Sequence, residues 1–201
     1  MKWFQLRPRI PVFPDNGKRD ALARPRLRPF WFRLRRVGFK DMKPTLYLDT
    51  TIPSYLFDER DSIKLHIEIT RKWWAEERGN FDIWASGEVL NEITAGKYPK
   101  KNEISKFASA IPILSPNSRV VDIARIYLEN HLMPRVLKGD SLHLAYASFY
   151  RMGFLLTWNC NHLANANKRK HIRVINARLG LPTPEIVTPL ELFSETIDDY
   201  E

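Results

Sequence analysis

The sequence predicts an α/β fold: a three-layer α/β/α domain around a central, mainly parallel sheet of four to five strands. Short apolar runs that end at turn-forming or polar residues recur along the chain, at 46–48, 81–85 and 154–157. Such runs are typical of buried strands of a parallel sheet. Segments in which apolar residues keep helical spacing lie between them. Strands that alternate with helices favour a parallel sheet that is covered by helices on both faces.

The first half of the chain predicts two strands and two helices. The first strand, 46–48, ends at Asp49. A helix over 62–78 follows, because its apolar residues keep helical spacing and a glycine ends it. The second strand, 81–85, leads into a short helix over 86–96, with a serine at its N-terminal cap and a glycine at its end.

The second half of the chain continues the alternation of helices and strands. Helical spacing is clearest for Val120, Ile123 and Tyr127, and again for Leu142 and Phe149. The remaining predicted elements are, in order, a lysine-rich helix to about 108, a strand at 111–114, a helix opened by Ser115-Pro116, a helix from Gly139 to Gly153, a strand at 154–157, a polar helix through 161–168, weak pairing at 172–175, a strand at 185–187 and a terminal helix.

Composition indicates one globular domain of ordinary size. The chain has 201 residues, of which 44% are apolar and 12% aromatic, enough for a sizeable core. No apolar run approaches the length of a membrane span, and no signal-peptide pattern is present. The single cysteine, Cys160, excludes an internal disulfide framework and a cysteine-rich zinc site. These observations favour a cytoplasmic protein.

The net charge of +9 is confined to the first 41 residues. Residues 1–41 hold 12 Lys/Arg, three Asp/Glu and five prolines, whereas the rest of the chain holds 20 of each charge type. The segment 1–41 is therefore interpreted as a basic extension, disordered or not translated, in front of a domain over 42–201. Met42 followed by the first strand favours initiation at Met42. The domain itself is neutral, so its charge alone does not indicate nucleic-acid binding.

Three carboxylates and one amide follow predicted strands or begin predicted helices: Asp49, Glu92, Asp140 and Asn159. In open α/β sheets, sites form beyond the carboxyl ends of the strands. Clustered carboxylates repel one another unless a divalent cation lies among them. Mg²⁺ and Mn²⁺ favour oxygen ligands, and such sites support phosphodiester cleavage.

The order and context of these residues resemble a PIN domain, in the branch of toxin ribonucleases of type II toxin–antitoxin pairs (VapC-like). The resemblance covers roughly residues 42–193. Its motifs are Leu46-Tyr-Leu-Asp49-Thr-Thr, Ser86-Gly-Glu-Val-Leu-Asn-Glu92-Ile, Gly139-Asp140-Ser-Leu-His-Leu-Ala-Tyr-Ala, Leu155-Leu-Thr157-Trp-Asn159 and Glu185-Ile-Val-Thr-Pro-Leu-Glu-Leu-Phe193.

The resemblance implies a metal-dependent endoribonuclease that forms a homodimer and is held inactive by an antitoxin protein. It implies Asp49, Glu92, Asp140 and Asn159 as the catalytic set and Mg²⁺ or Mn²⁺ as the cofactor. The family usually has Asp where this chain has Asn159. We therefore expect one ion held by Asp49 and Asp140, with Glu92 assisting directly or through water, and a weakened second metal site.

Supporting and structural roles are expected for several neighbours. Thr157 is a candidate support of the acid cluster, unless it simply ends its strand, and Thr50 is a second candidate, although turn chemistry explains it as well. Glu88 suits the first turn of its helix electrostatically and is interpreted as structural. His143 and His162 lack partners at zinc-binding spacing and are interpreted as packing or surface groups.

Other functions stay open at this point. A haloacid-dehalogenase-type phosphatase would need a second Asp at position 51, which is Thr51. A Rossmann dinucleotide site would need a glycine-rich turn after the first strand, and this chain has none. A PIN-like domain with a weakened site would bind RNA or an antitoxin without cleaving RNA. The substitution at Asn159 is the feature that keeps this alternative open.

Overall fold

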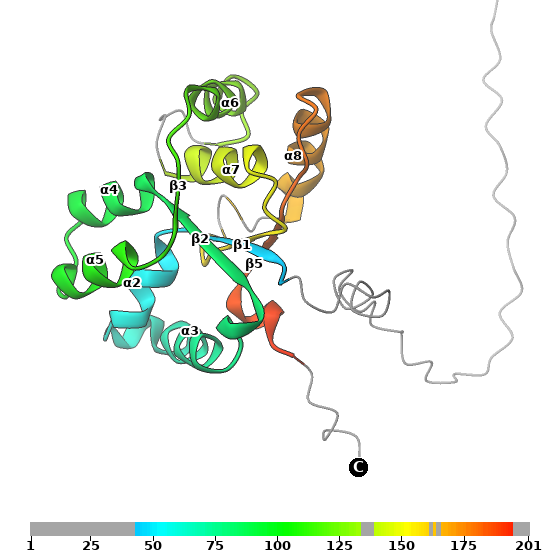
Figure 1. Cartoon of the computed structure of the whole chain (residues 1–201). Helices are drawn as coiled ribbons and strands as arrows, with labels where there is room; N and C mark the ends of the chain where they lie inside the picture. Colours follow the sequence, from blue (N-terminus) through cyan, green and yellow to red (C-terminus); the bar gives the residue numbers. More distant parts are fainter. Residues whose placement is uncertain (1–42, 134–138, 161–162, 164–165, 195–201) are drawn as a thin grey trace, which may run out of the picture. The chain divides into compact units, whose positions relative to one another are not determined.

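The computed structural model describes residues 43–133, 139–160, 163 and 166–194 (Figure 1). The basic extension 1–41 and the predicted start at Met42 lie outside the described residues. The division of the chain at this point therefore stays a prediction.

The described part of the chain forms one five-stranded sheet in the order β3-β2-β1-β4-β5. All four strand pairings are parallel. This confirms the predicted α/β class and the parallel sheet. The strands are β1 (Thr45–Leu48), β2 (Asp82–Ser86), β3 (Ile113–Leu114), β4 (Phe154–Leu156) and β5 (Glu185–Val187).

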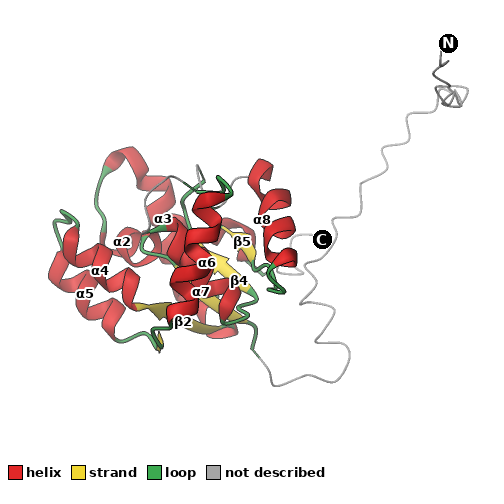
Figure 2. Cartoon of the chain, turned by 90° about the horizontal axis from the view of Figure 1, so that it is seen from above, coloured by secondary structure: helices red, strands yellow, loops and turns green. Residues whose placement is uncertain are grey.

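Helices cover both faces of the sheet and make it the middle of three layers. Figure 1 shows α6, α7 and α8 on one side of the sheet, and α2, α3 and α5 on the other. The short α4 follows β2 and packs against α5; both are seen together in Figure 2. The helices are α2 (Thr51–Phe57), α3 (Lys64–Glu76), α4 (Gly87–Ala95), α5 (Lys101–Ser109), α6 (Ser118–Glu129), α7 (Asp140–Phe149) and α8 (Ala166–Arg178).

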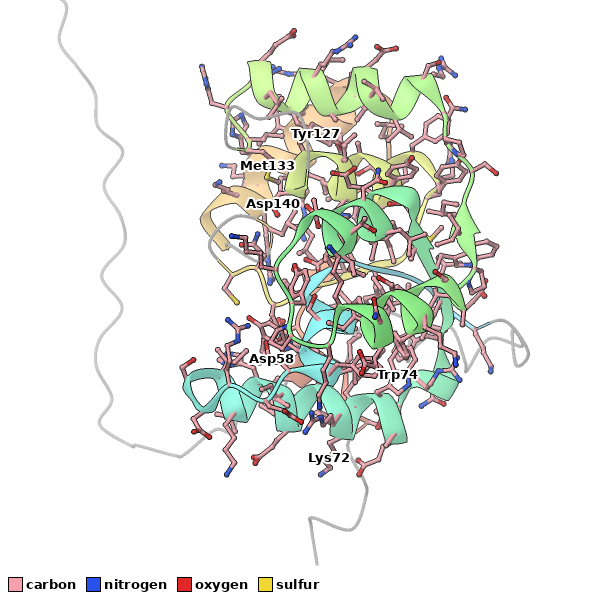
Figure 3. The ribbon with its side chains drawn as sticks, turned by 90° about the vertical axis from the view of Figure 1, so that its left-hand side faces the viewer. Asp58, Lys72, Trp74, Tyr127, Met133 and Asp140 are labelled. Atoms are coloured by element: carbon pink, nitrogen blue, oxygen red, sulfur yellow. The ribbon has the colours of Figure 1, made fainter. Side chains whose placement is uncertain are left out.

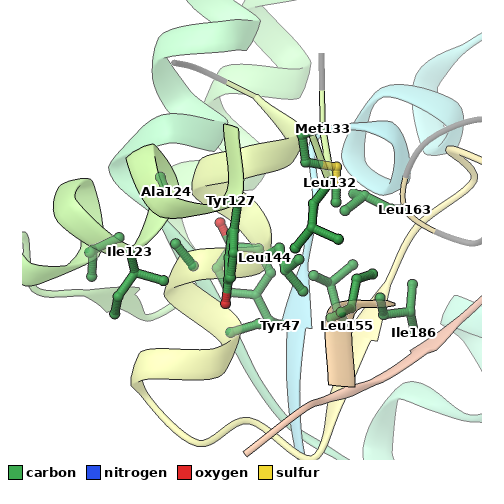
Figure 4. Packing of buried hydrophobic residues seen from close by; sticks show 14 of the residues in the cluster. Tyr47, Ile123, Ala124, Tyr127, Leu132, Met133, Leu144, Leu155, Leu163 and Ile186 are labelled. Atoms are coloured by element: carbon green, nitrogen blue, oxygen red, sulfur yellow. The ribbon is translucent and has the colours of Figure 1, made fainter. Parts of the chain in front are cut away.

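The larger core cluster lies between the sheet and the layer of α6, α7 and α8. Tyr47 of β1 is fully buried there, in register with Leu155 of β4, and packs with Tyr127, Leu144 and Ile186 (Figure 4). Leu46 and Leu48 alternate with Tyr47 along β1, and successive side chains of a strand point to opposite faces. Both faces of β1 are therefore packed, as its continuous apolar sequence predicts.

Buried polar side chains connect α8 to α6 and α7 within this layer. Asn176, fully buried on α8, accepts a hydrogen bond from Tyr127 Oη at 2.6 Å. Its Nδ2 donates to Ser148 Oγ at 3.0 Å and to Pro182 O at 3.0 Å. Burial raises the pKa of Tyr127 to about 12, although its hydrogen bonds with Ser148 and Asn176 lower it. The tyrosine therefore stays protonated and keeps its hydroxyl as a donor.

Two segments differ from the sequence prediction. The weak pairing predicted for 172–175 is wrong, because these residues belong to α8. Ile172 and Ile175 are both buried in the core cluster, and their i, i+3 spacing places them on one helix face. The predicted terminal helix is a short 3₁₀ turn, Pro189–Leu192.

Other element boundaries follow local chemistry that the sequence carries only weakly. Helix α2 begins right after Asp49 and was not predicted. Pro53 lies in its first turn, where a missing N–H is tolerated. Helix α6 begins at Ser118 because the side chain of Asn117 accepts a hydrogen bond from Arg119 N at 2.9 Å. No helix among the described residues is long and apolar enough to cross a membrane.

We predict that Asn176→Ala strongly destabilises the domain. The substitution leaves the buried hydroxyl of Tyr127 and the Pro182 carbonyl without this partner, and orphaned buried polar groups of this kind cost about 1–3 kcal/mol each. Urea unfolding should show the loss as a lower midpoint. The matched control is Tyr127→Phe, which removes one hydroxyl of the same network and should lose less. Equal stability of Asn176→Ala and the wild-type protein would contradict this account.

Candidate active site

The predicted site residues gather at the carboxyl end of the sheet. Asp49 directly follows β1, and its backbone N–H still donates to Leu156 O of β4 at 3.2 Å. Asn159 follows β4, and Asp140 is the first residue of α7. In Figure 3, Asp140 lies between Met133 above and Asp58 below. This is the edge where α/β sheets place their sites.

A chain of hydrogen bonds connects Asp49 to Asp140. Thr157 Oγ1 donates to Asp49 Oδ2. The same Thr157 oxygen accepts the backbone N–H of Asn159 at 2.8 Å. Asn159 Nδ2 then donates to Asp140 Oδ1 at 2.7 Å. The ends of β1, β4 and α7 are thereby tied together through the side chains that the sequence singled out.

Asp49 is a buried carboxylate, 2% exposed. Burial raises its pKa above the ordinary value of 3.8, although the charge of His143 and hydrogen bonds from Thr157 and Thr51 act in the other direction. Thr51 donates to Asp49 Oδ1 through its hydroxyl and through its backbone N–H, the latter at 2.8 Å. The aspartate therefore also supports the turn into α2. The raised pKa means that the surrounding groups compensate the buried charge only in part.

Glu92 belongs to a second group of side chains in the site. Its Oε2 accepts a hydrogen bond from Thr50 Oγ1 and lies 3.1 Å from Nε2 of His143. Thr50 Oγ1 is itself 3.4 Å from the same ring nitrogen. The structure thus brings Glu92, Thr50 and His143 together around one carboxylate oxygen.

His143 continues this group into the core. It is 2% exposed, and its Nδ1 lies 2.8 Å from Tyr47 Oη. Tyr47 Oη is in turn 2.6 Å from Ser86 Oγ. When the imidazole is protonated, both of its N–H groups donate, and the tyrosine hydroxyl is left to donate to the serine. A hydrogen-bonded relay, Ser86–Tyr47–His143–Glu92, therefore connects β2, β1, α7 and α4.

The environment of His143 favours its charged form. Burial lowers its pKa, but the hydrogen bond and charge of Glu92, together with the charges of Asp49 and Asp140, raise it more. The net pKa lies above the ordinary value of 6.5. An imidazolium among three carboxylates offsets part of their mutual repulsion.

The junction before α7 fits only glycine. Gly139 has φ +59°, and a Cβ there would lie 2.7 Å from Glu92 Oε1. Its backbone N–H donates to Glu88 Oε1 at 3.0 Å. Through this contact, which was not foreseen, Glu88 holds α4 against the start of α7. Glycine at 139 lets the backbone beside Asp140 approach the carboxylate of Glu92 closely.

The residues present fit a hydrated divalent cation better than a closed protein cage. Among the described residues, no group of three or more His, Cys, Asp or Glu side chains is arranged to hold a metal ion. Mg²⁺ keeps several waters and commonly uses only one or two carboxylates. Asp49, with its incompletely compensated charge, and Asp140 supply two, and the side-chain oxygen of Asn159 is a neutral candidate. Glu92 is directed to Thr50 and His143.

Sequence reasoning missed part of this arrangement. His143 is not a surface group, and its contacts with Tyr47 and Glu92 were not foreseen. The available signal was its position three residues after Asp140, which places both on one helix face. His162 lies outside the described residues.

Trp158 secures the loop that carries Asn159. Its backbone N–H donates to Thr51 Oγ1 at 2.9 Å, and its indole Nε1 donates to Thr70 Oγ1 at 2.7 Å. Its ring stacks near that of Tyr55, with centroids 6.4 Å apart. These contacts fix the direction in which the chain leaves β4.

Comparisons with known proteins identify no family for this chain. No protein-family model matches it, and no curated protein matches it significantly. Among solved structures it is similar to the crystal structure of VapBC2 from Rickettsia felis bound to a DNA fragment from their promoter. The identity is 20%, the match covers 72% of this chain and 98% of that chain, and the TM-score is 0.46. A likeness of this extent adds no argument about the site.

We predict that the metal-free protein loses stability as the pH rises above about 6.5. Because the folded-state pKa of His143 is raised above 6.5, the stabilisation by its charged form is complete below the unfolded pKa and is lost as the pH rises through the folded pKa. Urea unfolding in EDTA across this range measures the loss. His143→Gln keeps a donor but does not titrate there, so its slope should be smaller. An unchanged slope in this variant would refute the assignment to His143.

Proposed function

We propose that this chain is a divalent-metal-dependent endoribonuclease of the PIN type that hydrolyses RNA phosphodiester bonds. The observation that carries the proposal is the hydrogen-bonded chain from Asp49 through Thr157 and Asn159 to Asp140. It places residues from the first, third and fourth motifs of the sequence resemblance at one end of the sheet. Glu92, from the second motif, lies beside them through Thr50 and His143.

In this proposal Asp49 and Asp140 hold a Mg²⁺ or Mn²⁺ ion, with Asn159 as a neutral supporting ligand. A bound ion of this kind supplies an activated water and offsets negative charge at the scissile phosphate. Thr157 and Thr51 orient the carboxylate of Asp49 through their hydroxyl groups. Thr50 and His143 hold Glu92 Oε2 in place.

The proposal extends to the biological setting that the motif resemblance implies. The chain would be the toxin of a type II toxin–antitoxin pair, forming a homodimer, with an antitoxin protein as its inhibitor and RNA as its substrate. Its place of action would be the cytoplasm, where that substrate is found. Co-purification with a protein encoded beside it would test the antitoxin part independently of any cleavage assay.

A second candidate is a PIN-like binding module that does not cleave RNA. The hydrogen bond from Asn159 Nδ2 to Asp140 Oδ1 favours it, because an amide N–H here occupies one oxygen of a proposed ligand. In this alternative the domain would bind RNA or an antitoxin with the same surface. Metal-dependent cleavage that requires Asp140 separates the two candidates.

We predict that RNA cleavage by the purified protein requires metal and Asp140. The assay uses a mixed RNA substrate with Mg²⁺ or Mn²⁺, with EDTA, and with Asp140→Asn. Removing a carboxylate ligand should lower the rate by about a hundredfold or more. The control Asp122→Asn makes the same change on α6, where Asp122 contacts Arg125 at the surface, and should retain full activity.

The outcomes of this assay assign the function. Loss of cleavage with EDTA and with Asp140→Asn, but not with Asp122→Asn, would support the metal nuclease. A folded protein that binds Mn²⁺ and RNA but cleaves in none of the preparations would favour the binding module. Cleavage that persists undiminished in Asp140→Asn would overturn the proposed site.

We also predict that Asn159→Asp tightens metal binding and destabilises the metal-free protein. The added charge would favour a cation, whereas without one it would place two carboxylates within hydrogen-bonding distance of each other. Mn²⁺ titration calorimetry should show about tenfold higher affinity, and thermal unfolding in EDTA a lower midpoint. Asn117→Asp, an exposed cap of α6 that keeps its capping ability, is the charge-matched control. Unchanged affinity and rate would show that residue 159 does not bear on the metal.

A further inference from the structure

Helix α8 concentrates positive charge in a domain that is otherwise balanced. Its 13 residues include five Lys/Arg and no Asp or Glu, whereas the chain beyond residue 41 has equal numbers of basic and acidic residues. Lys170, Arg173 and Arg178 are exposed, and Lys168 is half-buried. We call Lys170, Arg173 and Arg178 the basic face of α8, because Lys168 lies one turn before the buried Ile172, on the other side of the helix.

The charges of this face are not neutralised within the described part of the chain. Arg169 of the same helix contacts Glu191 at 3.7 Å and donates to Ile186 O at 3.2 Å. The three residues of the basic face form no ion pair with any described residue. By contrast, Lys100 pairs with Glu59, and Lys101 donates to a backbone carbonyl of α4. The lysine-rich segment around 97–101 is therefore partly engaged, whereas the basic face remains available to an anion.

The basic face begins next to the candidate site. Leu163 N donates to Asn159 O at 3.0 Å, and Asn159 contacts Asp140. Leu163 is fully buried and lies beside Leu132 and Met133 (Figure 4). Helix α8 starts three residues later, at Ala166. Its first turns, with Lys170, therefore come only a few residues after Leu163, which contacts Asn159.

The opposite end of α8 lies away from the acids. Asn176 near this end bonds to Ser148, close to the end of α7, whereas Asp140 begins α7. The C-terminal part of α8 thus lies by the C-terminal part of α7, at the end of that helix opposite Asp140. At 1.5 Å per residue, the basic face extends for about 12 Å from Lys170 to Arg178. Its three charges lie along the solvent-exposed side of the helix.

The chemistry of this face fits a polyanion better than a protein interface. Hot spots of protein interfaces centre on buried aromatic and apolar anchors. On the exposed side of α8, the one large apolar side chain that is substantially exposed among the described residues is Val174, at 41%. Lys170 and Arg173 are one turn apart, which places them about 5–6 Å from each other at Cβ. Two cations at this spacing match successive backbone phosphates, and arginine can bind a phosphate through two N–H groups.

We propose that the basic face of α8 binds the phosphate backbone of single-stranded RNA and leads the strand to the site of Asp49 and Asp140. This inference rests on the proposed function, because it assigns the substrate of that site. It also supplies the site with attraction for phosphate, which a cluster of carboxylates by itself repels.

The test measures RNA binding separately from cleavage. The full-length protein is titrated into a fluorescein-labelled, single-stranded RNA of mixed sequence in EDTA, and anisotropy is recorded at several salt concentrations. The variant Lys170→Glu/Arg173→Glu should bind at least about tenfold more weakly at low salt. The slope of log affinity against log salt should fall by about 1.4, since each lost phosphate contact contributes about 0.7 for single strands. The basic extension 1–41 is common to all proteins compared.

The control variant is Lys106→Glu/Arg119→Glu. Both residues are exposed on other helices, α5 and α6, and the change in net charge is identical. Preserved binding by this control, with weakened binding by the α8 variant, would establish the basic face as the RNA contact. Equal weakening of both variants would show a general charge effect and refute the inference, and so would unchanged binding by the α8 variant. If the α8 variant binds RNA normally but loses affinity for an acidic polypeptide such as polyglutamate, the face serves a protein partner instead.

The two proposals fail in different ways. If the α8 variant binds RNA as well as the control variant does, the role of α8 is refuted, whether or not the protein cleaves RNA. If only the α8 variant binds RNA more weakly but no metal-dependent cleavage is found, the nuclease is refuted and α8 remains the RNA contact of a binding module. Circular dichroism of both double variants confirms that exposed substitutions leave the fold unchanged.

Discussion

The buried carboxylate of Asp49 is the constraint on which the rest of the site depends. Because it lies at the end of the central strand and is almost inaccessible to water, its charge needs partners from the protein. Thr51 provides them from the start of α2 and Thr157 from the end of β4. Satisfying one charge thus joins the end of β1 and the adjacent turn into α2 to the loop that carries Asn159, 108 residues further along the chain.

A second layer of polar contacts lies beneath this one and reaches into the core. The side chain of Tyr47 packs in the core cluster between the sheet and α7, yet its hydroxyl forms hydrogen bonds with Ser86 and His143. Fully satisfied buried networks of this kind favour one arrangement of the elements over others. The relay therefore fixes α7 relative to β1 and β2, and with it the position of Asp140, before any ligand binds.

The sequence was sufficient for the fold class and for the positions of Asp49 and Asn159 after their strands, because both depend on patterns that are local. The apolar runs of β1 and β4 and the turn residues after them reveal buried strands, and Asp49 and Asn159 follow at their ends. The extent of α8 was misjudged because Ile172 and Ile175 suit a strand or a helix equally over so short a stretch. The burial of both side chains in the folded core decides in favour of the helix.

The part of the site that the sequence did not predict depends on contacts between residues far apart in the chain. His143 bonds to Tyr47 and Glu92, which are 96 and 51 residues away in the chain. No spacing rule connects such positions, so its role emerges only when α7 is placed against the sheet. The close approach of Gly139 to Glu92 is similar, since the glycine looks like an ordinary helix start until its backbone conformation and its neighbour are known.

The amide of Asn159 has a consequence for how the site behaves in a cell. Its N–H group donates a hydrogen bond to an oxygen of Asp140 and so offsets part of the negative charge that a cation would otherwise neutralise. This hydrogen bond lowers the cost of the Asp140 charge in the absence of any ion, and in the proposed function a binding ion would have to displace the amide as well as water. The amide would thus lower the affinity of the site for a cation, while it stabilises the site when no cation is bound. The domain would remain folded over a wide range of ion concentrations, with occupancy following the free ion level instead of being saturated at all times.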